Sequence, residues 1–296
     1  MKGFHSGQDG AVEVTTSIGE VRALLERARV EGRTVGLVPT MGYLHDGHVS
    51  LMAQARAEVD LVVVSIFVNP LQFGAGEDLA SYPRDLPADT SRARAAGVDV
   101  LFVPEQAEMY PEPPLTSVVV PELAKTMEGA SRPTHFAGVA TVVAKLFAIV
   151  GPCRAYFGEK DFQQLRIVTR MAADLSFPVD VVGCPIVREA DGLALSSRNV
   201  YLTPDERAAA PVLHRALEAG AAAVSGGVRD PAEVRALMAG MVSAEPLADL
   251  DYAEVVDANS LLRTDILAGE IRLLIAGRFG RPRLLDNLGM LVPEQG

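Results

Sequence analysis

The chain has 296 residues, of which 49% are hydrophobic and 5% aromatic, and its charged side chains give a formal charge of −11 at pH 7. This length accommodates one large domain or two modest domains with their own cores. The negative charge argues against a nucleic-acid partner, because binding a polyanion normally needs a basic face.

Neither a membrane segment nor a disulfide framework is expected. Residues 1–10 contain no apolar signal core, and the longest apolar stretch, residues 139–150, carries Lys145 and is shorter than the roughly twenty residues that span a bilayer. Two cysteines, Cys153 and Cys184, are too few for a disulfide scaffold. We therefore expect a cytoplasmic protein that has no membrane partner.

Apolar runs alternate with helical patterns through the first two thirds of the chain. This alternation predicts an α/β fold, a Rossmann-like doubly wound parallel sheet in which ligands bind beyond the carboxyl ends of the strands. Several of the runs lack polar alternation, as buried parallel strands should. The predicted strands are residues 35–38, 61–68, 98–103, 155–157 and 179–184, and the predicted helices are residues 48–57, 89–96, 137–149 and 162–174.

The character of the sequence changes after Pro185. A polar connection over residues 188–201 leads into an Ala-rich helical region over residues 205–243. Residues 252–256 and 272–277 are predicted as strands, and the turn around Gly280 predicts a hairpin that ends in residues 283–287. We therefore predict two domains, residues 1–186 with the Rossmann-like sheet and residues 187–296 as a smaller α+β domain.

The most informative motif directly follows the first predicted strand. His45 and His48 lie three residues apart, with Gly42 and Gly47 around them, where a strand would lead into a helix. The start of a helix favours negative charge, and glycines let a bound group approach the main chain. Imidazoles can donate hydrogen bonds to phosphate oxygens. The motif therefore predicts a site for a nucleotide phosphate.

Two plainer interpretations of this motif remain open. The histidines could form a zinc pair, although helical zinc pairs usually lie at i, i+4 and the remaining candidates, including His5, His135 and His214, are scattered. Alternatively, Asp46 could cap an ordinary helix beside two incidental histidines. For His135 we favour a partly buried imidazole with its own partner over a phosphate ligand.

Amides and aromatic rings end the second predicted strand. Asn69 and Gln72 could hold a hydroxylated substrate, with Phe67 as an apolar wall. The alternative is turn chemistry around Asn69 and Pro70, which explains Asn69 easily and Gln72 less well.

Two further segments carry charge suited to a nucleotide. Lys160, one of only four lysines, could neutralise phosphate beside Asp161, which could accept from ribose hydroxyls. The alternative is an Asp161 helix cap beside a solvated lysine. Ser196, Ser197 and Arg198 could fold over a triphosphate as a flap, or could form an ordinary polar loop.

Together, these segments resemble the pantoate–β-alanine ligases, or pantothenate synthetases, of the HxGH nucleotidyltransferase superfamily. The resemblance implies ATP-dependent condensation of pantoate with β-alanine through a pantoyl-adenylate, releasing pyrophosphate and then AMP. It also implies Mg²⁺ and a homodimer. The matching segments run in the family's order, and they are residues 39–48, 65–74, 82–84, 132–138, 157–164 and 188–199.

The resemblance also assigns roles to positions. It makes His48 the proton donor, Asp89 the candidate Mg²⁺ ligand, and residues 187–296 a domain that closes over an ATP- and pantoate-binding first domain. The alternative for Mg²⁺ is an ion held largely by phosphates and water. The implied ATP site comprises Met41, Gly42, Gly47, His48, Gly158, Lys160, Asp161, Val187, Leu195, Ser196, Ser197 and Arg198. The implied substrate site comprises Gln72 and Gln164 for pantoate, with Asn69, Met41 and Phe67.

Adenylate formation needs no protein nucleophile, so we expect catalysis by positioning and charge neutralisation. Two departures from the family pattern are Leu195, where methionine is usual, and Tyr43, where a small residue is common. Two rival functions are a nucleotidyltransferase acting on a phosphorylated acceptor and a regulator whose paired histidines bind zinc. The expected catalytic set is His45, His48, Lys160, Ser196, Ser197 and Arg198.

Overall fold

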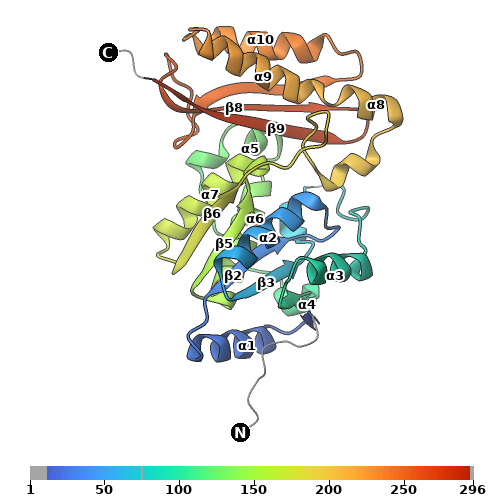
Figure 1. The fold of residues 1–296 in the computed structure, drawn as a ribbon, viewed down its shortest axis with the longest axis vertical. Coiled ribbons are helices and arrows are strands. Elements are labelled where there is room, and N and C mark those ends of the chain that lie inside the picture. Colours follow the sequence, from blue (N-terminus) through green and yellow to red (C-terminus); the bar gives the residue numbers. More distant parts are fainter. Residues whose placement is uncertain (1–11, 75, 294–296) are drawn as a thin grey trace. The chain divides into compact units, whose positions relative to one another are not determined.

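A computed structural model of the chain describes residues 12–74 and 76–293, so the prediction made for residues 1–10 lies outside the described residues. The chain forms two compact units (Figure 1). The second unit contains all of residues 187–296 together with two short earlier segments. The first unit comprises Met1–Glu122, Arg132–Glu159 and Ile167–Cys184, and the second comprises Leu123–Ser131, Lys160–Arg166 and Pro185–Gly296.

The first unit is built on a six-stranded parallel sheet in the order β1-β4-β3-β2-β5-β6. This arrangement confirms the predicted doubly wound α/β fold. The chain proceeds outward from β2 through β3 to β4, and then from β5 to β6 on the other side, so the strand order reverses between β2 and β5. Ligands of such sheets bind at this reversal, beyond the carboxyl ends of the strands. The strands are β1 Glu13–Thr15, β2 Val35–Thr40, β3 Leu61–Ile66, β4 Val100–Phe102, β5 Cys153–Gly158 and β6 Val179–Cys184.

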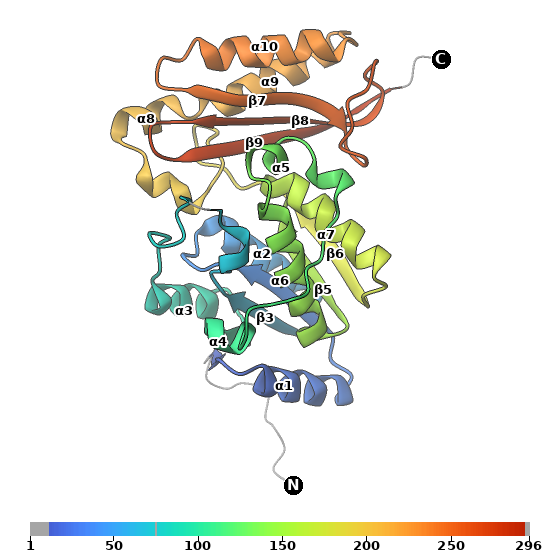
Figure 2. The ribbon, with the colours of Figure 1, turned by 180° about the vertical axis from the view of Figure 1, so that it is seen from behind.

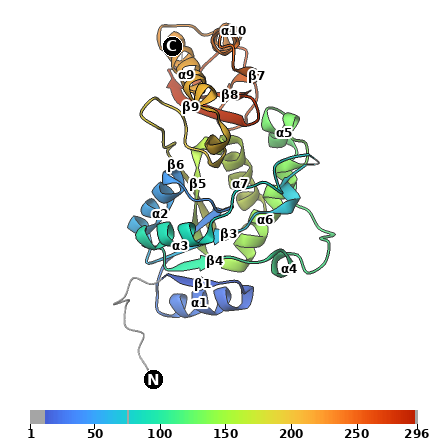
Figure 3. The ribbon, with the colours of Figure 1, turned by 90° about the vertical axis from the view of Figure 1, so that its right-hand side faces the viewer.

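Helices cover both faces of this sheet. Figure 3 shows α2 and α3 on one face and α6 on the other. The core under α2 forms because Met52 and Ala55 face the sheet one turn apart and pack against Val62 and Val64 of β3. The four predicted helices are all present, as α2 Asp46–Glu58, α3 Leu86–Ala95, α6 His135–Val150 and α7 Phe162–Asp174.

Two observed elements, β1 and α1 Ile18–Val30, were not predicted from the sequence. Ser17 caps α1 by accepting a hydrogen bond from Glu20 N at 3.4 Å. Ser-x-x-Glu is a recognised helix-start pattern, so the signal was present in the sequence. Short segments complete the elements before Cys184: η1 Pro70–Gln72, α4 Gln106–Met109, η2 Glu122–Ala124, α5 Glu128–Ser131 and η3 Glu159–Asp161.

The second unit has an antiparallel sheet in the order β7-β8-β9, with α9 and α10 packed on one face (Figures 1 and 2). Leu213 and Met238 from these helices share a core with Leu273 and Ile275 of β8. The predicted hairpin is confirmed as β8 and β9, with Gly280 at φ +57° in its turn. The elements are η4 Ser197–Tyr201, α8 Pro204–Ala209, α9 Val212–Ser225, α10 Pro231–Ser243, β7 Asp249–Asp257, β8 Gly269–Arg278 and β9 Arg283–Val292.

The single helical region predicted for residues 205–243 is three helices. Pro211 begins a new helix after α8, and Gly227 at φ +107° breaks the chain after α9. Pro231 then occupies the first turn of α10, where its missing N–H costs nothing. Among the described residues, no helix combines the length and apolarity needed to cross a bilayer.

Candidate active site

The paired histidines form the start of α2, directly after β2. His45 is the N-cap, and its Nδ1 accepts from Gly47 N at 3.2 Å, while His45 N donates to His48 Nδ1 at 3.3 Å. The ring centroids lie 4.1 Å apart. Because each Nδ1 accepts a backbone hydrogen bond, a neutral ring carries its proton on Nε2. Both imidazoles therefore have the tautomer that donates from Nε2.

This arrangement overturns one alternative for the motif, the capping of an ordinary helix by Asp46. Asp46 is not the cap; it is the first helical residue, and it pairs with Arg92 at 3.2 Å on the surface. The Gly47 amide is bonded to the His45 ring, so this backbone donor is already used within the turn. Across residues 12–74 and 76–293, no group of three or more His, Cys, Asp or Glu side chains could hold a metal ion, and the zinc alternative gains no support.

Asp89 of α3 holds the loop between β2 and α2. Its buried carboxylate accepts from Tyr43 N at 2.8 Å and from Leu44 N at 2.7 Å. Burial raises the pKa of Asp89, and the two backbone donors oppose that rise. Gly42 and Tyr43 adopt φ values of +83° and +52°, a conformation that is unusual for a tyrosine and that these bonds help to fix. The prediction that Asp89 binds Mg²⁺ stays a prediction, because the structure gives both carboxylate oxygens another task.

Replacing Asp89 with asparagine is expected to destabilise the protein and loosen this loop. Asparagine offers one carbonyl oxygen, so one backbone N–H would lose its acceptor and face an amide N–H₂ group. We expect the free energy of unfolding to fall by about 1–3 kcal/mol. Urea denaturation measures the change, with Asp46→Asn as the control, since that exposed ion pair contributes about 0–1 kcal/mol. Equal stabilities for the two variants would contradict the role given to Asp89.

The amide of Asn69 is fully engaged within the first unit. Its Nδ2 donates to Gln72 Oε1 and to Gly138 O, both at 3.1 Å, and its Oδ1 accepts from Leu71 N at 3.3 Å and from Tyr110 Oη at 3.0 Å. Burial raises the pKa of Tyr110 to about 12, so its hydroxyl remains a donor at neutral pH. The turn alternative therefore accounts for Asn69 as the cap of η1, and direct contact with substrate stays a prediction.

Asn69 fixes the orientation of Gln72. Since Asn69 donates, the Gln72 atom facing it is the acceptor Oε1, and the Gln72 N–H₂ group is turned toward Met41, with Nε2 3.0 Å from Sδ. Phe67 is buried nearby and contacts the Tyr110 ring in a tilted arrangement, with centroids 5.9 Å apart. Within the first unit, the structure thus joins the predicted substrate residues Gln72, Asn69 and Met41.

Residues at and just before the start of α6 contact the main chain of η1. His135 Nδ1 lies 2.9 Å from Gln72 O, and Arg132 Nη2 donates to the same oxygen at 3.3 Å. Arg132 also forms two hydrogen bonds with Glu77, and these bonds lower the pKa of that carboxyl to about 2. The interpretation of His135 as a partly buried imidazole with its own partner is confirmed.

In the second unit, Lys160 and the serine-rich loop line one pocket. Lys160 lies in η3, and its Nζ is 3.7 Å from Asp161 Oδ1. Gln164 follows on the first turn of α7 and is half-buried. The pocket is lined by Lys160, Leu193, Ala194, Ser196, Ala210, Leu213, His214, Leu284, Leu285 and Asp286.

The serine-rich loop starts from a short antiparallel turn. Leu195 N donates to Val187 O at 3.0 Å, and Arg188 bridges to Ala194. Ser196 then caps η4 by accepting from Arg198 N at 3.3 Å, which places Ser197 and Arg198 in the first turn of η4. The predicted residues thus form two groups, one in each unit, with Gly158 ending β5 in the first. That these groups meet around one triphosphate stays a prediction.

Comparisons with known proteins identify the family. A sequence profile described as pantoate-beta-alanine ligase matches residues 13–289. The pantothenate synthetase of Heliobacterium modesticaldum is 57% identical over 272 residues, covering 92% of this chain and 97% of that protein. The crystal structure of pantothenate synthetase from Thermus thermophilus is 51% identical, with a TM-score of 0.89 and coverage of 94% and 99%. The chain belongs to the pantoate–β-alanine ligase family.

A more distant family member was solved with ligands. The pantoate-beta-alanine ligase from Francisella tularensis, described as complexed with beta-gamma ATP and beta-alanine, is 33% identical, with a TM-score of 0.76 and coverage of 94% of this chain and 97% of that one. Membership in the ligase family confirms the resemblance drawn from the sequence motifs.

In this member of the ligase family, the residues that support the site were not predicted from the sequence. Tyr110 orients Asn69, while Arg188, Asp286 and Asn287 hold the segments of the second unit. Part of the signal was visible, since Arg188 begins a matched motif, but no local pattern shows that it pairs with a carboxylate 98 residues away.

Proposed function

We propose that this chain condenses pantoate with β-alanine at the expense of ATP, forming pantothenate, AMP and pyrophosphate. The observation that carries the proposal is the family match over residues 13–289. Within the first unit, His45 and His48 can donate hydrogen bonds from Nε2, and Asn69 holds the amide of Gln72 in one orientation. These groups supply the hydrogen-bond donors that such a reaction needs.

The first step would join pantoate to the nucleotide. The pantoate carboxylate attacks the α-phosphorus of ATP, an oxygen–phosphorus bond forms, and pyrophosphate leaves. His45 and His48 donate from Nε2 to phosphate oxygens, and His48 can pass its Nε2 proton to the leaving group. Lys160, Ser196, Ser197 and Arg198 neutralise the triphosphate. Gln72, a neutral donor, orients pantoate without the loss of nucleophilicity that an arginine clamp on its carboxylate would cause.

In the second step, the neutral amine of β-alanine attacks the carbonyl of the pantoyl-adenylate, the amide bond forms, AMP leaves with the bonding electrons, and the nitrogen releases one proton to solvent. Water would hydrolyse this mixed anhydride, so we infer that residues 187–296 close over the site during reaction. Gln164 and Asn69 are included in the pantoate site on the same family resemblance.

Mg²⁺ would accompany ATP and screen its phosphates. In the part of the chain that the structure describes, no group of three or more His, Cys, Asp or Glu side chains could hold a metal ion, and Asp89 is already bonded to two backbone amides. Phosphate oxygens and water would therefore supply most of the ligands of the ion. On the family resemblance and the low cysteine content, we also propose a cytoplasmic homodimer.

The proposed function predicts which substrates each half-reaction needs. AMP release should require ATP, pantoate and β-alanine together. Exchange of pyrophosphate into ATP should require pantoate but not β-alanine. Nucleotide analysis by chromatography, with each substrate omitted in turn, measures both. AMP transfer to a phosphorylated acceptor without β-alanine would instead identify a nucleotidyltransferase, and pantoate-independent exchange would overturn the adenylate mechanism.

A further inference from the structure

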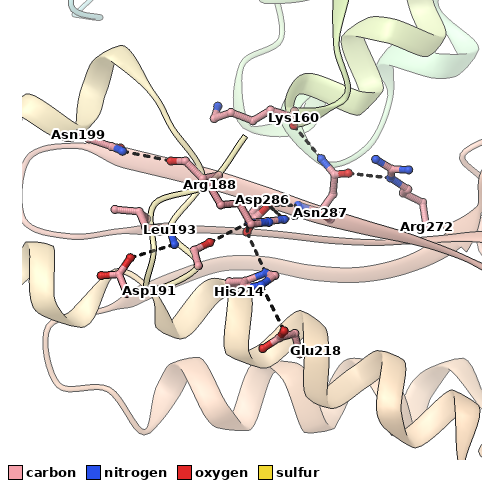
Figure 4. Close-up of polar contacts among 12 residues, drawn as sticks. Lys160, Arg188, Asp191, Leu193, Asn199, His214, Glu218, Arg272, Asp286 and Asn287 are labelled. Atoms are coloured by element: carbon pink, nitrogen blue, oxygen red, sulfur yellow. Dashed lines mark hydrogen bonds and ion pairs between the residues drawn. The ribbon is translucent and has the colours of Figure 1, made fainter. Parts of the chain in front are cut away.

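Two consecutive buried residues of β9 contact both nucleotide segments of the second unit. Asp286 and Asn287 are 4% and 2% exposed. Figure 4 shows Asn287 next to Lys160 and Asp286 next to Arg188 of the loop that leads to Ser196. Burying a carboxylate and an amide is costly unless each is hydrogen-bonded, so their partners indicate what the two residues do.

Asn287 holds the main chain at Lys160. Its Nδ2 donates to Lys160 O at 2.8 Å, and its Oδ1 accepts from Arg272 Nε at 2.7 Å. Because arginine only donates and a carbonyl only accepts, these two partners admit one orientation of the amide. The Arg272 guanidinium is itself fixed, lying 3.9 Å from the ring centroid of Phe162. The hydrogen bond from Asn287 therefore fixes the Lys160 backbone to β9, with the amide held in one orientation.

Asp286 holds the turn that precedes Ser196. Its carboxylate receives two hydrogen bonds from Arg188, at 2.6 and 2.9 Å, and Arg188 also donates to Gly192 O at 3.0 Å. Gly192, at φ +92°, packs so closely on His214 that a Cβ there would collide with the ring. Arg188 therefore bonds to the main chain of this turn, and the His214 ring packs against the turn at Gly192.

This turn sets where the hydroxyl groups lie. Leu195 N bonds to Val187 O at 3.0 Å at the open end of the turn, and Ser196 follows immediately. Lys160, Ser196 and Asp286 line the same pocket. The side chains of Asp286 and Asn287 thus act on two segments, far apart in the sequence, that contribute Lys160 and Ser196 to the lining of one pocket.

We propose that Asp286 and Asn287 are positioning residues for ATP: Asn287 sets the placement of Lys160, and Asp286, through Arg188, sets the placement of Ser196, Ser197 and Arg198. The proposal rests on the proposed function, in which these segments bind the triphosphate. Asp286 and Asn287 act through the residues they hold. Misplacing those residues weakens ATP binding and adenylation, and leaves β-alanine binding unchanged.

Asn287→Asp tests the contact between Asn287 and the Lys160 backbone with little change in side-chain volume. Aspartate keeps an acceptor for Arg272 but places an oxygen against Lys160 O, so the main-chain hydrogen bond is lost. We expect the KM for ATP in pantoate-dependent pyrophosphate exchange to rise about tenfold, which corresponds to about one lost hydrogen bond. The KM for β-alanine, measured at saturating ATP, should stay within about twofold. Asn259→Asp, an equal charge change at an exposed turn residue of the same unit, should match the wild type.

Arg188 variants test the contact between Asp286 and Arg188. Arg188→Lys keeps the positive charge but cannot bond to both carboxylate oxygens in a fork, and Arg188→Ala removes both features. The KM for ATP should rise in both variants and more in the alanine variant, while the KM for β-alanine stays constant. This graded response is specific to positioning, because simple destabilisation would lower the melting temperature and reduce the amount of active enzyme without changing the KM for ATP.

The outcomes separate this inference from the proposed function. If the wild-type chain does not release AMP with all three substrates, the proposed function is wrong. If the wild type is active and the KM for ATP of N287D equals that of N259D, the inference is wrong. It is also wrong if the KM values for all three substrates rise together. Should N287D fail to melt cooperatively, N287A, which introduces no charge, decides by the same comparison.

Discussion

Replacing Gly138 with alanine is expected to abolish most ligase activity and to lower the free energy of unfolding by about 3 kcal/mol, as the combined cost of overpacking and one lost hydrogen bond. Gly138 lies in the first turn of α6, where the helix packs directly on η1. A Cβ at this position would lie 2.5 Å from Gln72 N and still closer to Leu71 O. Both are backbone atoms, so neither can rotate away as a side chain would.

The damage should reach the substrate site because α6 and η1 share hydrogen bonds. Gly138 O accepts from Asn69 Nδ2, and Asn69 in turn orients Gln72. Moving α6 away from η1 breaks the first bond and frees the Gln72 amide to turn. Urea denaturation and AMP release with all substrates measure the two effects, and the KM for pantoate should rise in whatever activity remains.

Gly240→Ala is the matched control for this substitution. Gly240 lies inside α10, and within the described part of the chain no heavy atom comes within 4 Å of its Cβ position apart from those of its chain neighbours and its own helix backbone. Alanine there should stabilise the protein by about 0.4–1 kcal/mol, because glycine loses more backbone entropy when a helix forms. Wild-type stability and pantoate KM in Gly138→Ala would show that α6 does not hold η1 as described.

The parallel sheet could be predicted because its strands are continuous apolar runs between helical patterns. β6 was predicted at its observed bounds, Val179–Cys184, although this edge strand is mostly half-buried. β1 has three residues, too few for any periodic signal. The missed helix α1 differs, because its Ser17-x-x-Glu20 start could have been recognised. Local sequence patterns therefore predict strands and helices that have a long apolar run or a recognisable helix start, and they fail for a strand as short as β1.

The candidate site was predictable as a set of segments but not as a set of contacts. The position of His45 and His48 after β2 followed from the order of elements alone. By contrast, Asp89 reaches Tyr43 across 46 positions, and Asn287 reaches Lys160 across 127. Such pairings depend on how the elements pack, and a single sequence contains no local pattern for them. The tautomers of the two imidazoles likewise follow only from the observed hydrogen bonds.

The tautomer of His48 leads to the prediction with the second large effect. In the structure, Nδ1 accepts from His45 N at 3.3 Å and stabilises the helix start, so Nε2–H is the group that serves the chemistry on the proposed mechanism. The two nitrogens therefore have separate tasks, one structural and one catalytic. Asparagine and glutamine test the catalytic task, because an asparagine Oδ1 can take the place of Nδ1 but offers no donor at the Nε2 position, whereas a glutamine amide N–H₂ can take the place of Nε2–H.

His48→Asn should keep the cap and lose the donor. We expect pantoate-dependent pyrophosphate exchange to fall about 10²–10³-fold, or about 3–4 kcal/mol of activation free energy, as for the loss of an oxyanion donor. His48→Gln places at N3 a residue that favours the capping box, so we expect little loss of stability, and it should retain more exchange activity than His48→Asn. The opposite order of activities would show that the contact between His45 and His48, rather than the Nε2 proton, is what the reaction requires.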